Sequence, residues 1–184
     1  MEKEFKNFEE ISDEEKRFPI AFARTVYRDY LMLEQMLSVE YAPHNVYCYS
    51  LDRKADKKFK ERIRALSRCF SKNVFVSDVE YNVYSSGKNV SRSHLSCLEN
   101  LNKRKEDWKY VVLLQTLKPK NAYPPNIKQL NHTKSLNLIV LSRAAVNFTL
   151  KQLNVYPFID KLEKSRYGMD EIGTQPDGRK RLVF

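Results

Sequence analysis

The chain has 184 residues, 42% of them hydrophobic and 12% aromatic, and it carries a formal net charge of +10 with a pI of about 9.4. This length allows one domain with a real core, and the apolar fraction excludes a disordered protein. The four glycines form neither a GxGxxG nor a GxxxxGK(S/T) loop, which excludes a Rossmann dinucleotide site and a P-loop. The basic residues are spread out without a nucleic-acid-reading motif, so we expect a solvated basic surface and no nucleic acid partner.

The first predicted unit is a strand, a helix and a second strand. Residues 1–17 are charge-rich and predict a loosely helical lead-in, whereas residues 19–27 are apolar, β-branched or aromatic, as in a strand covered on both faces. Asp29 can cap a helix that Pro43 stops, and residues 46–51 predict the second strand. Such a unit is a right-handed βαβ crossover. The helix carries a broad apolar stripe of Leu31, Met32, Leu33, Met36, Leu37 and Val39.

Asp52 follows directly on that second strand. Ligands of open α/β sheets bind at the carboxyl ends of the strands, so Asp52 is a candidate binding residue. A carboxylate at the end of a strand is also a common turn or cap residue, and the sequence alone leaves both interpretations open.

Helices and strands continue to alternate after Asp52, which predicts an α/β fold with a mostly parallel sheet flanked by helices. A Pro-rich, irregular connector is expected over 116–135. The other predicted elements are a helix over 54–69, a strand over 73–76, a loop over 78–92, a helix capped by Ser91 or Ser93, strands over 108–114 and 136–141, a helix capped by Ser142, and a helix over 156–166.

The cysteines and histidines do not form a metal motif. Cys48, Cys69 and Cys97 include no CxxC pair, and no histidine stands at metal-ligand spacing, so we expect no metal. An odd number of cysteines leaves either free thiols or one bridge with a leftover thiol, and both alternatives stay open.

Three sequons bear on the cellular compartment. Asn89, Asn131 and Asn147 each begin an N-x-(S/T) triplet, which permits N-glycosylation in the secretory pathway and also arises by chance. No apolar run approaches the ~20 residues that span a bilayer, and the N-terminus is charged. We therefore expect no signal or transmembrane segment in this chain.

Several motifs occur in the order seen in a known family. They are FPIAFARTVY at 18–27, YCYSLD at 47–52, RCFSKNVFV at 68–76, HLSCLENL at 94–101, WKYVVLLQ at 108–115, LSRAAVNFTLKQLN at 141–154 and RYGMDE at 166–171. In these motifs the chain resembles the core-2/I-branching β-1,6-N-acetylglucosaminyltransferases, and within them the nematode-type branch.

The resemblance implies the nucleotide-binding half of an A-type glycosyltransferase, incomplete, over 18–171, internally shortened around 116–139 and followed by a tail over 172–184. It implies transfer of N-acetylglucosamine from its uridine diphosphate (UDP) donor to the hydroxyl of a glycan or glycoprotein acceptor, with inversion and without a metal or other cofactor. It also implies the lumenal side of the Golgi membrane, through an anchor missing from this chain. A second hypothesis is a truncated, catalytically inactive protein that binds a nucleotide or a partner.

The resemblance also assigns residues. Glu171 matches the family's catalytic base, because displacement at an anomeric carbon needs a carboxylate that takes the proton of the acceptor hydroxyl. Asp52 would hydrogen-bond to the uracil or ribose of the donor, Tyr84 would pack on the base, and Thr25 would line the same pocket.

The same resemblance implies how the three cysteines are paired. It implies a bridge between Cys48 and Cys97, which would tie the second strand to the helix that follows Tyr84. Cys69 matches a cysteine whose partner lies upstream of the domain in the family, so we expect it to be unpaired or mispaired.

Overall fold

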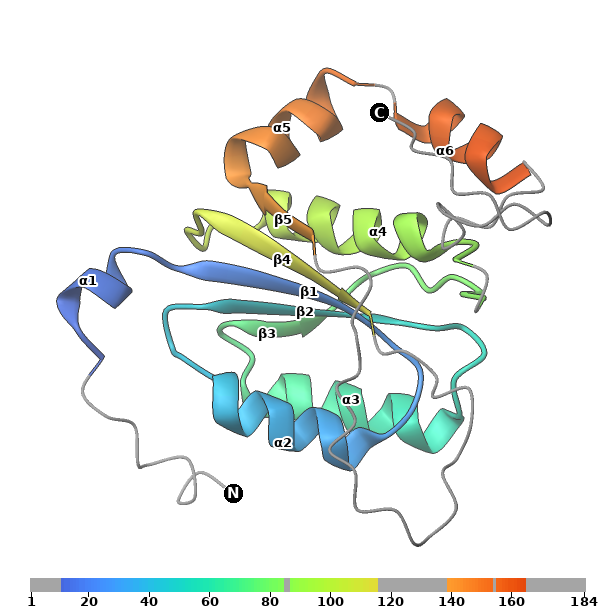
Figure 1. Ribbon diagram of the computed structural model, residues 1–184. Helices are drawn as coiled ribbons and strands as arrows, with labels where there is room; N and C mark the ends of the chain where they lie inside the picture. The colour runs from blue at the N-terminus through green and yellow to red at the C-terminus, as the bar shows by residue number, and fades with distance from the viewer. Residues whose placement is uncertain (1–10, 85–86, 116–138, 154, 165–184) are drawn as a thin grey trace, which may run out of the picture.

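The computed structural model describes residues 11–84, 87–115, 139–153 and 155–164 (Figure 1). The strands form a five-stranded sheet in the order β3–β2–β1–β4–β5, and they are parallel except for β5, which runs antiparallel to β4. The predicted α/β class with a mostly parallel sheet is therefore confirmed. In chain order the elements are α1 (Asp13–Lys16), β1 (Ile20–Val26), α2 (Tyr30–Glu40), β2 (Val46–Leu51), α3 (Lys57–Cys69), β3 (Val74–Val76), α4 (Val90–Lys103), β4 (Tyr110–Gln115), β5 (Ile139–Ser142), α5 (Arg143–Lys151) and α6 (Val155–Lys164).

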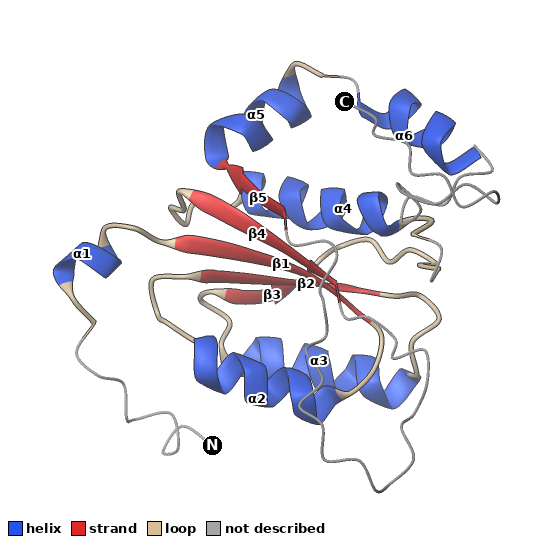
Figure 2. Ribbon diagram, in the orientation of Figure 1, coloured by secondary structure: helices blue, strands red, loops and turns tan. Residues whose placement is uncertain are grey.

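Helices cover both faces of the sheet, as Figure 2 shows, with α4 on one side and α2 and α3 on the other. We call these the α4 face and the α2–α3 face. The side chains of β1, the central strand, alternate between them. Ala21, Ala23 and Thr25 lie on the α4 face, whereas Phe22 and Val26 pack in the cluster of the α2–α3 face. All six residues of β2 are buried, as expected of a strand covered on both sides.

The α4 face is packed mostly with small and aliphatic side chains, together with the fully buried Trp108, and a disulfide crosses it. Cys48 on β2 is bonded to Cys97 on α4, with their Cα atoms 5.8 Å apart. This is the pair that the family resemblance implied, and Cys69 is a free, exposed thiol. Val146 of α5 and Ile159 of α6 are buried in the same cluster, so the two C-terminal helices are docked on α4.

The α2–α3 face carries two buried tyrosines. Tyr47 and Tyr49 of β2 are 1% and 2% exposed, and they share a cluster with Leu37 of α2 and Ile63 of α3. Burial raises the pKa of both tyrosines to about 12. This face is therefore filled by bulky side chains whose burial removes much apolar surface from water.

A buried ion pair joins the sheet to the end of α2. Arg24 of β1 is 4% exposed, and its Nη2 lies 2.8 Å from Oε1 of Glu40. Burial raises the pKa of the Glu40 carboxyl, and the neighbouring Arg24 partly opposes this rise. Removal of Glu40 would leave the buried charge of Arg24 without this partner, so the pair helps to hold α2 on the sheet.

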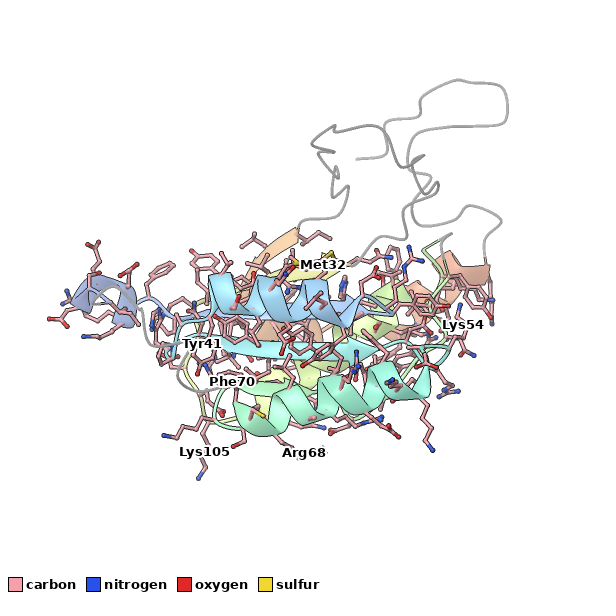
Figure 3. The ribbon with its side chains drawn as sticks, turned by 90° about the horizontal axis from the view of Figure 1, so that it is seen from below. Met32, Tyr41, Lys54, Arg68, Phe70 and Lys105 are labelled. Atoms are coloured by element: carbon pink, nitrogen blue, oxygen red, sulfur yellow. A yellow bond between two sulfur atoms is a disulfide. The ribbon has the colours of Figure 1, made fainter. Side chains whose placement is uncertain are left out.

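The apolar stripe of α2 differs from the sequence prediction, because only Leu33 and Leu37 of its six members are buried. Leu31 and Val39 are 65% and 88% exposed. Met32 lies on the side of α2 away from α3 (Figure 3). Periodicity gives the direction of the apolar stripe, but the width of the contact depends on how the helix meets the sheet.

The helix start at Asp29 is confirmed in its position only, and the start of α4 differs from the prediction. Asp29 precedes α2, but its φ is 62° and its side chain makes no capping hydrogen bond. α4 begins at Val90 after Asn89, whose φ is 65°, so the predicted cap at Ser91 or Ser93 is wrong. Short-range cap patterns do not show that a polar residue will enter the left-handed region, which asparagine and aspartate tolerate better than most residues.

The margins of the domain are described in part. The lead-in predicted over 1–17 is described from Ile11 onward and contains α1, where Ser12 and Glu15 form a capping box. The connector predicted over 116–135 and the tail over 172–184 lie outside the described residues.

Candidate functional site

Asp52 ends β2 and is held in a turn at the carboxyl edge of the sheet. Its side chain is buried, and Oδ1 accepts a hydrogen bond of 2.9 Å from the backbone N–H of Lys54. Its own N–H donates to the carbonyl of Val26 at the end of β1, at 3.0 Å, and it pairs with Tyr81 in an isolated parallel bridge. Asp52 is thus a turn residue. Its second oxygen, Oδ2, lies 4.0 Å from Nζ of Lys54 and takes part in none of these backbone hydrogen bonds.

Lys54 joins Asp52 to Tyr84. Its Nζ lies 4.0 Å from the centroid of the Tyr84 ring, and that tyrosine is 45% exposed. Figure 3 shows Lys54 near the beginning of α3, at the opposite end of that helix from Phe70. The structure therefore brings two predicted donor-binding residues, Asp52 and Tyr84, to one ammonium group that sequence reasoning missed. The only available signal was a lysine two positions after the strand-end aspartate.

The loop over 77–84 is anchored to the turn that follows β2. The backbone N–H of Arg53 donates to the Tyr81 carbonyl at 2.9 Å, and its guanidinium donates to the Glu80 carbonyl at 2.9 Å. The carboxylate of Glu80 lies 2.7 Å from Nζ of Lys60 on α3. These contacts fix the loop that carries the exposed tyrosine against the turn that carries the aspartate.

Thr25 belongs to a chain of three buried hydroxyls. Its Oγ1 donates to Oγ of Ser93 on α4 at 3.1 Å, and that oxygen lies 2.7 Å from Oγ of Ser50 on β2. Thr25 is 4% exposed, and the two serines are 0% exposed. The hydroxyls connect the first half of α4 to the carboxyl ends of two strands. Thr25 lies beneath the helix, and its role in lining a donor pocket stays a prediction.

His94 is a further residue that sequence reasoning missed. Its Nε2 lies 3.2 Å from the carbonyl oxygen of Leu114 near the end of β4. A carbonyl only accepts, so this nitrogen carries the ring proton. Burial lowers the pKa of His94, and the hydrogen bond with Leu114 partly opposes that shift. The ring is therefore neutral at pH 7, and a single histidine in an amphipathic helix offered no pattern that marks it.

The beginning of α4 lies at the same edge of the sheet, and carboxylates of α6 offset the positive charge found there. Nε of Arg92 lies 3.0 Å from Oε2 of Glu163, and the same guanidinium pairs with Asp160. The other oxygen of Glu163 accepts a hydrogen bond of 3.0 Å from the backbone N–H of Asn89. An acidic group at this end offsets the partial positive charge of the helix N-terminus.

The remaining predicted residues fall outside the cluster. Glu171 and Asn131 lie outside the described residues. Asn89 precedes α4, and its Nδ2 donates to a loop carbonyl at 2.7 Å, whereas Asn147 lies within α5. Glycosylation of these asparagines stays a prediction.

Two surface hollows lie outside the cluster of Asp52, Lys54 and Tyr84. One, of about 410 Å³, lies between α4 and the α5–α6 segment, and another, of about 480 Å³, lies beside α3 and β3; neither is lined by Asp52, Lys54 or Tyr84. Within the described residues, no group of three or more histidine, cysteine, aspartate or glutamate side chains could hold a metal ion. No helix in the same part of the chain is long and apolar enough to cross a membrane.

Comparison with known proteins gives matches to one family. A family model described as Core-2/I-Branching enzyme matches residues 20–118. The chain is 36% identical over 104 residues to a human N-acetyllactosaminide beta-1,6-N-acetylglucosaminyl-transferase, covering 56% of this chain and 26% of that protein. It is 33% identical over 135 residues to the Danio rerio beta-1,3-galactosyl-O-glycosyl-glycoprotein beta-1,6-N-acetylglucosaminyltransferase 4, covering 72% and 31%. The chain thus spans about a quarter to a third of the length of these relatives.

Proposed function

This chain belongs to the Core-2/I-Branching enzyme family, and from that membership we propose that it acts in β-1,6-N-acetylglucosaminyl transfer, as the relatives' names state for them. The proposed donor is UDP-N-acetylglucosamine and the acceptor is a hydroxyl of a glycan or glycoprotein. The transfer would invert the anomeric carbon and proceed without a metal.

The observation that carries this proposal is the cluster of Asp52, Lys54 and Tyr84 at the carboxyl edge of the sheet. A buried carboxylate can accept hydrogen bonds from the polar edge of a base or from ribose hydroxyls, and a half-exposed aromatic ring can stack on the base. Open α/β sheets bind ligands at this edge. The cluster therefore suits the nucleoside part of the donor.

The proposed chemistry assigns the base to Glu171. Its carboxylate would take the proton of the acceptor hydroxyl while the new bond from oxygen to the anomeric carbon forms. The bond from that carbon to the diphosphate oxygen breaks in the same step, and UDP leaves with the electron pair. A positioned base of this kind contributes roughly 10²-fold to 10⁴-fold to the rate.

The disulfide between Cys48 and Cys97 supports the lumen of the Golgi as the proposed location. Disulfides persist in oxidising compartments and are rare in the cytosol. N-glycosylation at Asn89, Asn131 or Asn147 would occur in the same pathway.

Donor binding is tested by calorimetric titration of the purified chain with UDP-N-acetylglucosamine in the presence of a chelator, followed by a transfer assay on a mucin-type acceptor. Asp52→Asn is the informative variant, because its Oδ1 can still accept from Lys54 and keep the turn while the carboxylate charge is lost. We expect the donor dissociation constant to rise roughly 10-fold or more, as for loss of a charged hydrogen-bond acceptor. Asp78→Asn, at an exposed position of the neighbouring loop, is the control and should bind like wild type.

Three outcomes decide the proposal. Saturable binding with turnover supports the enzyme, and Glu171→Gln should then abolish transfer while leaving donor affinity nearly intact. Binding without turnover on any acceptor would contradict the proposed reaction and leave a nucleotide-binding protein. A folded wild-type chain that binds no donor would overturn the donor site itself.

A further inference from the structure

We propose that Lys54 is a positioning residue that sets the plane of the Tyr84 ring for a stacked base; this inference rests on the proposed function of the site. The two residues come from different segments, the β2–α3 turn and the loop after β3. Nζ of Lys54 lies 4.0 Å from the ring centroid and also donates to the carbonyl oxygen of Val83, the residue before the tyrosine. The ammonium therefore contacts both the ring and the backbone from which the ring projects.

Lys54 is itself fixed by Asp52. The backbone N–H of Lys54 donates to Oδ1 of the aspartate at 2.9 Å, and its Nζ lies 4.0 Å from Oδ2. The aspartate is buried, whereas the lysine side chain is 40% exposed. The buried carboxylate of Asp52 thus positions the ammonium of Lys54, and that ammonium in turn contacts the exposed ring of Tyr84.

The side chain of Tyr84 is half-exposed, so a contact such as the one with Lys54 can set the plane of its ring. The ring is 45% exposed, whereas the backbone of Tyr84 is hydrogen-bonded: its N–H donates to the Lys88 carbonyl at 3.1 Å, and its carbonyl accepts from the Gly87 N–H at 3.0 Å. Gly87 has a φ of 82°, a left-handed value that suits glycine. These backbone bonds fix the position of the residue, and the plane of its ring depends on side-chain contacts such as the one with Lys54.

The contact also selects one side of the ring. The face of an aromatic ring carries partial negative charge and attracts an ammonium group. Because Lys54 lies over one face of Tyr84, a planar base that stacks on this ring would take the opposite face. The lysine then raises affinity for the base without touching it, because it pre-organises the ring.

Titration with uridine and with UDP separates positioning from direct contact with phosphate. Lys54→Met keeps most of the length of the side chain and removes the ammonium, and Lys54→Arg restores a cation that can lie over the ring. We expect Lys54→Met to raise both dissociation constants by the same factor, about 5-fold to 10-fold, and Lys54→Arg to recover most of the loss. Lys58→Ala removes an exposed lysine from the first turn of α3 and should leave both constants unchanged.

A double-mutant cycle with Tyr84→Ala tests whether the lysine acts through the ring. Positioning requires that Lys54→Met has no further effect once the ring is removed. A loss for UDP alone would overturn the inference in favour of a phosphate contact, and a loss that persists without Tyr84 would overturn it in favour of direct contact with the nucleoside. Unchanged constants in Lys54→Met would overturn it as well.

If the wild-type chain binds neither uridine nor UDP, the proposed function fails. The positioning inference is then tested on the Tyr84 ring without a ligand. The NMR signals of the Tyr84 ring should shift and average in Lys54→Met but not in Lys58→Ala. Ring signals that are the same in Lys54→Met and wild type would overturn the positioning role.

Discussion

The two faces of the sheet are held by different kinds of interaction. On the α4 face, small side chains such as Ala21 and Ala23 lie under a helix that is joined to β2 by a disulfide and to two strands by hydroxyl hydrogen bonds. On the α2–α3 face, apolar side chains of two helices, such as Ile63, pack against bulky side chains of the strands, such as Tyr47, beside the ion pair of Arg24 with Glu40. Thr25, a predicted donor-binding residue, belongs to the first arrangement.

This difference separates the interactions that fix the geometry at the carboxyl ends of the strands from those that supply most of the stability of the domain. Directional and covalent bonds fix α4 relative to the carboxyl ends of the strands, where Asp52 and the hydroxyl chain lie. Apolar packing is less directional, and it supplies stability in proportion to the surface removed from water. We therefore expect changes on the two faces to act differently, and the following predictions run from the largest effect to the smallest.

Removal of the disulfide should have the largest effect. The bridge closes a loop with a sequence separation of 49 residues, for which chain entropy predicts a loss of about 4 kcal/mol in the variant Cys48→Ala/Cys97→Ala. Urea denaturation measures the loss, and hydrogen exchange should show amides of α4 opening before those of α3. Cys69→Ser is the matched control, because that thiol is free and exposed. An unchanged urea midpoint in the double variant would contradict the prediction.

Truncation on the other face should cost somewhat less. Ile63 is 0% exposed and lies among side chains too large to close the gap that Ile63→Ala would leave. We expect a loss of about 3 kcal/mol in the free energy of unfolding, again by urea denaturation. Glu61→Ala, on the exposed side of α3, should change stability by less than about 0.5 kcal/mol. Equal urea midpoints for the two variants would show that α3 contributes little to the core.

The smallest predicted effect is a dependence of the α4 face on pH. Because the pKa of His94 is lowered in the folded state, the unfolded chain takes up a proton first as the pH falls below about 6.5. Stability should therefore be full above that pH and fall, by at most about 1.4 kcal/mol per pH unit, until the folded pKa is reached.

The effect of His94 is isolated by comparison with His94→Gln, whose amide can still donate to the Leu114 carbonyl but does not titrate. The difference in unfolding free energy between the two proteins should change between pH 6.5 and lower pH, and it should be constant above pH 6.5. A difference that does not vary with pH would contradict the assignment. The raised pKa of Glu40 acts in both proteins and cancels.

Local patterns in the sequence were sufficient for the α/β class and for most elements. Alternating apolar segments of strand and helix length predicted the sheet, and Ser142 caps α5 as predicted, through a hydrogen bond from the Ala145 N–H. The position of Asp52 at the end of β2 also followed from chain order alone. These features depend on residues close together in the chain, whose spacing the sequence contains.

Only the tertiary structure decided which side chains meet. Lys54 reaches Tyr84 and Thr25 reaches Ser93 across 30 and 68 positions of sequence, and no local pattern marks either pair. The exposure of Val39 in the apolar stripe of α2 likewise depends on how that helix lies on the sheet. Periodicity determines which face of an element is apolar, whereas the approach of distant segments determines how much of that face is covered and which polar groups find partners.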